Sequence, residues 1–186
     1  RVARNWGEQP MRVQAQHYAC PYYPVTSYDV LYKQSSQHVG GCLWHSFDHQ
    51  RGYHPDPFYG GLMDVFRQPK YSYYMFMAQR PAVKNDRNAG SGPMVYIAHE
   101  MTPFSGKDVT VYSNCDEVRL TFNKGGKTYT YKKDKNRPGM PSPVITFPDV
   151  YDFMVDKAFS RTQKQDDVYL LAEGLIDGKV VATHKV

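Results

Sequence analysis

The sequence predicts a mixed fold, with an α/β segment first and an all-β sandwich after it. Both tryptophans and five of the seven histidines lie before residue 60, among alternating helical and extended patterns. The second half is instead rich in Val, Thr and Tyr that alternate with period two. Between them, residues 81–93 read PAVKNDRNAGSGP and hold almost no apolar side chains, as a linker does. We therefore divide the chain into residues 1–80, a linker at 81–93, and residues 94–186.

The first part is predicted to contain three helices and one strand. Residues 8–19 are helical because apolar side chains recur there at spacings of four and three. After a Pro-Tyr-Tyr-Pro break, Ser27 can cap a second helix over 29–33. Residues 39–47 are a short apolar run that contains two glycines, which is typical of a buried strand. Pro69 opens a third helix, since its missing N–H costs nothing in a first turn. This order of elements indicates an α/β segment.

The second part is predicted to contain seven strands. Asp177-Gly178 lies between the last two and predicts a type I′ hairpin, because both residues tolerate positive φ. Residues 123–126 predict a looser hairpin. Seven strands in about 90 residues without a Cys-Trp-Cys spacing predict an immunoglobulin-like sandwich that lacks the disulfide. The predicted strands are residues 95–98, 109–112, 118–122, 128–132, 144–147, 168–176 and 180–184.

Charge and cysteine content argue against several classes of protein. The net charge of +5 is spread along the chain, with 10 Lys and Arg against 6 Asp and Glu before residue 94 and 13 against 12 after it. A nucleic-acid binder usually concentrates its charge, so the basic residues of 124–137 are interpreted as a solvated hairpin rather than a phosphate site. Cys20, Cys42 and Cys115 form neither a disulfide framework nor a metal pair, and we expect buried thiols. No apolar stretch approaches the roughly 20 residues of a membrane span.

The loop after the predicted strand is where a site is expected. Residues 40–61 read GGCLWHSFDHQRGYHPDPFYGG and place a Trp, three His, two Asp and an Arg after the carboxyl end of a strand. In α/β proteins ligands bind at that end. Aromatic faces could cover the C–H side of a pyranose while Asp, His and Arg bind its hydroxyls.

Other interpretations of this loop were weighed. A zinc site could use His45, His49 and either His54 or Asp56, but their spacing does not lie on one helix face, and no metal or other cofactor is expected. A nucleophilic Ser would need a Gly-x-Ser-x-Gly setting, which Ser46 lacks. The residues alone leave open a sugar site and a packed, purely structural aromatic loop.

Three stretches resemble glycoside hydrolase family 2. GGCLWHSFDHQRGY, residues 40–53, is similar to the eighth barrel strand of that family, and residues 60–80, GGLMDVFRQPKYSYYMFMAQR, to its next element. Residues 93–123, PMVYIAHEMTPFSGKDVTVYSNCDEVRLTFN, resemble the opening of the sandwich in its β-galactosidase branch. The resemblance implies that residues 1–80 are the terminal β/α portion of a (β/α)8 TIM barrel and that residues 94–186 are an immunoglobulin-like domain.

The resemblance also implies an activity. Family members are retaining glycosidases that use two carboxylates about 5–5.5 Å apart, so the chain is expected to be the C-terminal portion of an exo-β-galactosidase. Glu8 is the one Glu in the first half, but its order, Trp-Gly-Glu, reverses the family's Glu-aromatic-Gly. We interpret Glu8 as a helix-start carboxylate favoured by the dipole, and we expect both catalytic carboxylates in an upstream portion of the same polypeptide.

Site roles follow from the same resemblance. Trp44 matches the strand-8 Trp that forms a platform under the sugar, and the Trp44-His45 peptide is expected to be cis. His45 and Asp48 are expected to contact sugar hydroxyls, and Asp64 and Arg67 to form a structural ion pair. The expected partner is a galactose-containing oligosaccharide or polysaccharide, in the periplasm or outside the cell. A carbohydrate-binding or adhesion module that acts through the sandwich is the alternative. Residues expected at the rim or in the positive subsites are Arg51, Tyr53, His54 and Asp56.

Overall fold

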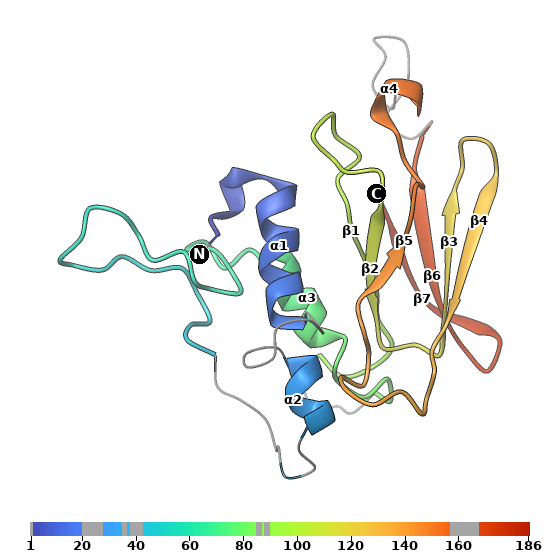
Figure 1. Ribbon diagram of the computed structural model, residues 1–186, viewed down its shortest axis with the longest axis horizontal. Coiled ribbons are helices and arrows are strands. Elements are labelled where there is room, and N and C mark those ends of the chain that lie inside the picture. Colours follow the sequence, from blue (N-terminus) through green and yellow to red (C-terminus); the bar gives the residue numbers. More distant parts are fainter. Residues whose placement is uncertain are drawn as a thin grey trace.

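The computed structural model describes residues 2–19, 28–34, 37, 43–84, 87, 90–156 and 168–186. A helical part lies beside two β-sheets (Figure 1). The helices are η1 (Arg4–Trp6, a 3-10 turn), α1 (Glu8–Ala19), α2 (Tyr28–Gln34), α3 (Tyr71–Met77) and α4 (Phe153–Asp156). The strands are β1 (Val95–Ala98), β2 (Val109–Ser113), β3 (Glu117–Phe122), β4 (Lys127–Lys132), β5 (Ile145–Phe147), β6 (Leu170–Ile176) and β7 (Lys179–Lys185).

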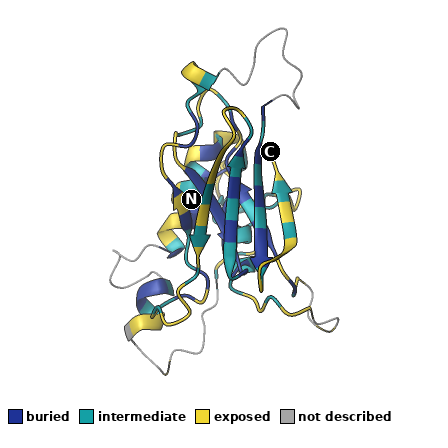
Figure 2. Ribbon diagram, turned by 90° about the vertical axis from the view of Figure 1, so that its right-hand side faces the viewer, coloured by how far each residue is buried: buried dark blue, intermediate teal, exposed yellow. Residues whose placement is uncertain are grey.

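The strands form two antiparallel sheets, ordered β1-β2-β5 and β4-β3-β6-β7. The seven predicted strands are confirmed, with ends that differ by at most two residues. In β3, Val118, Leu120 and Phe122 are buried while the intervening residues are only partly covered, as period two requires. These side chains pack with buried Val and Ile of β1 and β2, so the sheets enclose one core. In Figure 2 the buried residues follow the central strands.

Both predicted hairpins are present in the four-stranded sheet. The β6–β7 turn has φ of 50° at Asp177 and 74° at Gly178, the two positive values that the dipeptide predicts. The β3–β4 turn uses Gly125 and Gly126 at φ of 83° and 65°. Glycine reaches these angles without steric cost, which explains why the looser hairpin contains a Gly pair.

The helices pack against the three-stranded sheet. A second core joins Met11 and Ala15 of α1 and Met75 of α3 to Ala98 of β1 and Tyr112 of β2. Figure 1 shows α1 and α3 on the side of the sandwich next to β1 and β2. The predicted bounds of α1 are confirmed, and α2 extends one residue beyond its prediction at each end. The proposed cap Ser27 lies outside the described residues.

The predicted strand at 39–47 is not a strand in its described part. Residues 39–42 lie outside the described residues, and residues 43–47 make only an isolated parallel bridge, between Phe47 and Met63. A strand needs hydrogen-bonded neighbouring strands. Among the described residues, Met63 alone forms a β-bridge with this segment. Helix α3 is also shorter than predicted, since it begins two residues after Pro69. Cys115 is a buried free thiol, as expected, whereas Cys20 and Cys42 lie outside the described residues.

Candidate functional site

The loop at residues 43–61, here called the site loop, folds back on itself as a short two-stranded ribbon. His49 and Phe58 exchange two backbone hydrogen bonds, of 3.3 and 2.8 Å. The ribbon is tied to the rest of the chain where Asp48 N–H donates to the Met63 carbonyl at 2.9 Å. Gly61 must be glycine, because a Cβ there would lie 2.4 Å from the Asp48 nitrogen.

Lys70 holds the site loop in place through a buried ion pair with Asp48. Its ammonium is fully buried and donates to Asp48 Oδ1 at 2.7 Å and to the carbonyl of Val2 at 2.5 Å. The same Asp48 oxygen accepts from Gly61 N–H at 2.9 Å. Burial lowers the pKa of Lys70, and the Asp48 carboxylate opposes that shift. One buried ion pair therefore fixes the site loop against both the N-terminal segment and the start of α3.

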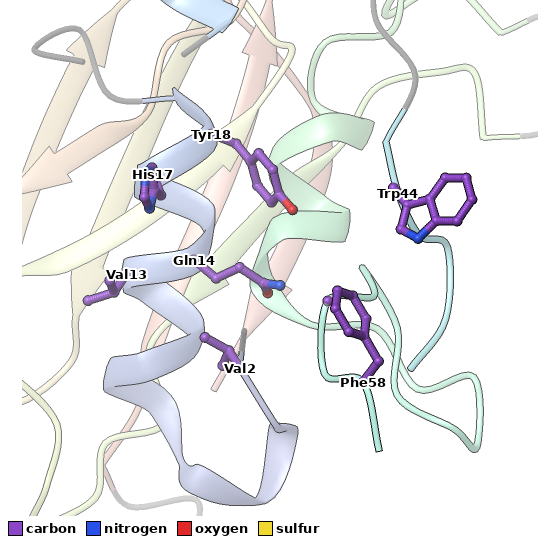
Figure 3. A pocket seen from close by; sticks show the side chains of 8 residues that line it. Val2, Val13, Gln14, His17, Tyr18, Trp44 and Phe58 are labelled. Carbon is purple, nitrogen blue, oxygen red and sulfur yellow. The ribbon is translucent and has the colours of Figure 1, made fainter. Parts of the chain in front are cut away.

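The Trp44 side chain is exposed and lines two cavities. Its side chain is 80% exposed, and its peptide bond to His45 is cis, which confirms the prediction. The first cavity, of about 470 Å³, lies between the indole, Phe58 and helix α1. Figure 3 shows Tyr18 and Gln14 directed from α1 toward the side where Trp44 and Phe58 lie. The ring is therefore accessible to a ligand rather than part of a closed core.

The second cavity, of about 360 Å³, is surrounded by aromatic and cationic side chains of the site loop. The His45 ring centroid lies 4.5 Å from that of Trp44, 4.3 Å from His49 and 4.9 Å from Phe58. The Arg51 guanidinium lies 5.7 Å from the Phe58 ring centroid. Such a cluster offers ring faces and a cation in one hollow.

Two polar atoms of the second cavity have unused hydrogen-bonding capacity. His45 Nδ1 and Arg51 Nε are buried and have no hydrogen-bond partner among the described residues. Burial lowers the pKa of His45, and the nearby His49 lowers it further, so the imidazole is favoured as the neutral form. Both atoms are covered, so a ligand in the cavity would reach them only after the surrounding side chains shift.

The predicted site residues divide into three groups. Trp44, His45, Arg51 and Tyr53 line the second cavity together with His49, which the sequence analysis considered only as a metal ligand. Asp48 is instead buried in its pair with Lys70. The other two, His54 and Asp56, lie at the exposed tip of the loop, where Asp56 N–H donates to His54 Nδ1 at 3.1 Å. Phe58 lines both the first and the second cavity, although no sequence pattern predicted it as a site residue.

Glu8 is engaged at the interface between α1 and the sandwich. It is buried, and its Oε2 accepts from Ser105 Oγ at 2.5 Å and from Glu100 N–H at 3.1 Å. Arg12 lies 3.9 Å from its other oxygen. Burial raises the pKa of Glu100, and the Glu8 charge raises it further. Glu8 therefore connects the helical part to the sheets.

The predicted ion pair between Asp64 and Arg67 is wrong. Asp64 lies 3.9 Å from Arg4 and accepts backbone hydrogen bonds from Phe66 and Gln68, whereas Arg67 lies 5.1 Å from the Phe47 ring centroid. Arg67 has φ of 64°, and its backbone N–H donates to the Asp64 carbonyl at 3.0 Å.

Residues 124–137 comprise the β3–β4 turn, β4 and the segment after it, and most of their Lys side chains are exposed, as the solvated interpretation predicts. Arg137 is drawn away from it into a bidentate pair with Asp29, at 2.8 and 2.9 Å. Within the described part of the chain, no three His, Cys, Asp or Glu residues are grouped as a metal site, and no helix is long and apolar enough to span a membrane.

No protein-family model matches the chain. It is 28% identical over 190 residues to a β-galactosidase of Thermoanaerobacter pseudethanolicus, an alignment that covers 87% of this chain and 24% of that protein. Among solved structures, a Bacteroides uniformis β-glucuronidase superposes with a TM-score of 0.53 at 20% identity over 86% of this chain and 17% of that chain. The chain resembles the family 2 glycoside hydrolases.

The comparisons differ in what they contribute. The structural match shows a shared fold, since its identity is low. A Parabacteroides merdae β-glucuronidase superposes less closely, with a TM-score of 0.49 at 23% identity over 77% of this chain and 16% of that chain. The chain spans about a quarter of the length of the curated relative that it matches.

Proposed function

We propose that this chain is the C-terminal portion of a retaining exo-β-galactosidase-like glycoside hydrolase, and that it supplies one wall of the sugar pocket. The observation that carries the proposal is the exposed Trp44 ring at the mouth of the second cavity, beside His45, His49 and Phe58. An open indole next to imidazole and guanidinium side chains suits a pyranose, which has an apolar C–H face and hydroxyls at its edge. The 28% identity to a β-galactosidase supports the same sugar class.

In this proposal residues 1–80 are the terminal β/α portion of a TIM barrel, residues 81–93 a linker and residues 94–186 an immunoglobulin-like sandwich. The parallel bridge between Phe47 and Met63 precedes α3 in the chain, which is the order of a barrel strand and its helix. The open apolar side of the first cavity, with Val13 61% exposed, is where the remaining barrel would pack.

Each wall residue has a distinct proposed role. Trp44 stacks on the sugar face, while the His45 imidazole and the Arg51 guanidinium, which line the same cavity, bind hydroxyls. Tyr53, 86% exposed, closes the rim of the cavity. Asp48 acts mainly as a positioning residue, because its Oδ1 already accepts two hydrogen bonds. The exposed pair His54 and Asp56 belongs to the outer rim.

The bond-breaking groups are proposed to come from elsewhere in a longer polypeptide. Retaining hydrolysis needs an acid and a nucleophile about 5–5.5 Å apart on either side of the scissile bond. Glu8 is held by Ser105, Glu100 N–H and Arg12 at the interface with the sandwich, an arrangement that suits a structural carboxylate. We propose that both catalytic carboxylates lie upstream, and that the enzyme works in the periplasm or outside the cell.

The test is hydrolysis of an aryl β-galactoside by the full-length polypeptide that contains these residues. Trp44→Ala should lower kcat/KM by on the order of 10- to 100-fold, because it removes the stacking face. Phe104→Ala is the control, since Phe104 is equally exposed, at 86%, but lies on the sandwich.

Two results would contradict the proposal. One is an unchanged kcat/KM in Trp44→Ala, and the other is absence of β-galactoside hydrolysis by the wild type. If Trp44→Ala binds galacto-oligosaccharides as tightly as the wild type and neither hydrolyses them, the carbohydrate-binding module that acts through the sandwich is the better description.

A further inference from the structure

The site loop presents a second hollow on the face opposite the second cavity. Successive residues of an extended strand point to opposite sides. His49 and Phe58, the hydrogen-bonded pair, line the second cavity, while their neighbours Asp48 and Tyr59 line a different one. The ribbon therefore separates two cavities, each built on one of its faces.

This third cavity has the size and lining of a sugar site. Its volume of about 280 Å³ lies near the lower end of the ~300–1,000 Å³ typical of small-molecule sites, which suits a single ring. Phe66 is 82% exposed at its edge, and Tyr59 forms another aromatic side, its ring centroid 5.4 Å from that of Trp6. Two ring faces in one small hollow match the C–H face of a pyranose.

The polar groups of the third cavity are held in place and partly unused. Asp64 Oδ1 accepts from the backbone N–H of Phe66 and of Gln68, at 2.9 and 2.8 Å, which fixes the turn that holds Phe66 outward. Asp48 also lines this cavity, but its side chain is only 2% exposed and is held in its pair with Lys70. Asn5 is exposed in the same lining, and no hydrogen bond of its amide occurs within the described chain.

Charge compensation in this cavity favours a neutral ligand. Asp48 is paired with Lys70 at 2.7 Å, and Asp64 lies 3.9 Å from Arg4. The described lining thus has no carboxylate or guanidinium without an opposite charge near it. A uronic acid or phosphate would find no free cation in this lining, while the hydroxyls of a neutral hexose could use the exposed Asn5 amide.

We propose that the third cavity binds a neutral sugar unit of the substrate other than the unit held against Trp44, so that the enzyme recognises an oligosaccharide or polysaccharide at two places. This inference rests on the proposed function and deepens it. The site loop would then lie between the two sugar units that it helps to bind.

The experiment compares two substrates in the full-length polypeptide. One is an aryl β-galactoside, which has a single sugar, and the other is a set of β-1,3-, β-1,4- and β-1,6-linked galactotrioses. Phe66→Ala should raise KM for the preferred trisaccharide about tenfold and leave KM for the aryl galactoside unchanged. Asn5→Ala should act in the same direction, and Phe104→Ala, an equally exposed Phe elsewhere, should change neither KM.

An equal rise of both KM values, or no rise in either, would overturn the inference. If the wild type hydrolyses none of these substrates, the proposed function fails on its own, and the comparison is made by titration calorimetry. In that case tighter trisaccharide binding by the wild type than by Phe66→Ala supports the third cavity, whereas equal binding or none refutes it.

Discussion

Removing the Lys70 ammonium should severely destabilise the chain. Lys70→Met keeps the length and apolar stem of the side chain but leaves the Asp48 carboxylate buried with Gly61 N–H as its one donor among the described residues. The Val2 carbonyl loses its bond as well. Breaking a buried pair by removing one partner costs about 3–5 kcal/mol, because the other charge stays uncompensated. That is a large part of the ~5–15 kcal/mol by which domains are stable.

Urea denaturation followed by tryptophan fluorescence measures this cost, since Trp6 and Trp44 belong to the segments that Lys70 joins. The double variant Asp48→Asn with Lys70→Met tests the mechanism. It removes both charges, so it should be less destabilised than the sum of the single variants by at least about 1 kcal/mol. A Lys70→Met cost below 1 kcal/mol, or additive single and double variants, would refute the reasoning.

Three further predictions concern other parts of the chain. Burial alone would raise the pKa of Asp29, but hydrogen bonds, chiefly from Arg137, lower it to about 2. The wild type should therefore lose roughly 2 kcal/mol more than Asp29→Asn between pH 5 and pH 2, measured by urea midpoints, because stability present above the ordinary pKa disappears as pH falls through the lowered one. In an NMR titration His45 should titrate below pH 6.5, and His49→Ala should move its midpoint upward; a fixed midpoint would contradict the described contact. Leu120→Ala, at a fully buried position, should cost about 2–5 kcal/mol by thermal unfolding, and a smaller loss would mean that the sandwich core is loosely packed.

The strands were the most predictable part of the fold because their signals are local. Alternation in residues 118–122 and the Asp177-Gly178 pair depend on neighbours in sequence, and the structure contains both. Helix α1 was equally clear from its spacing. The strand predicted at 39–47 differs because strand formation depends on partners, which a run of apolar letters does not specify.

The candidate site was predictable in its aromatic part and not in its polar part. The resemblance identified Trp44 and its cis peptide, and the structure exposes the ring beside a cavity. Asp48 was expected to contact the sugar because of its place in the stretch that resembles the family, four residues after Trp44. Its partner Lys70 lies 22 residues away and resembles any lysine at the start of a helix. Long-range pairing of this kind leaves no mark in local patterns.

The position of Lys70 also bears on how this surface could change. The Lys70 ammonium fixes the position of the site loop, which has the second cavity on one side and the third cavity on the other. A substitution that shifts the loop to enlarge one cavity must therefore narrow the other. A single substitution near residue 70 would then change the preference for the sugar unit in the second cavity and for the unit in the third cavity together. Independent tuning would need replacements at the far walls, such as Phe66 on one side and Arg51 on the other.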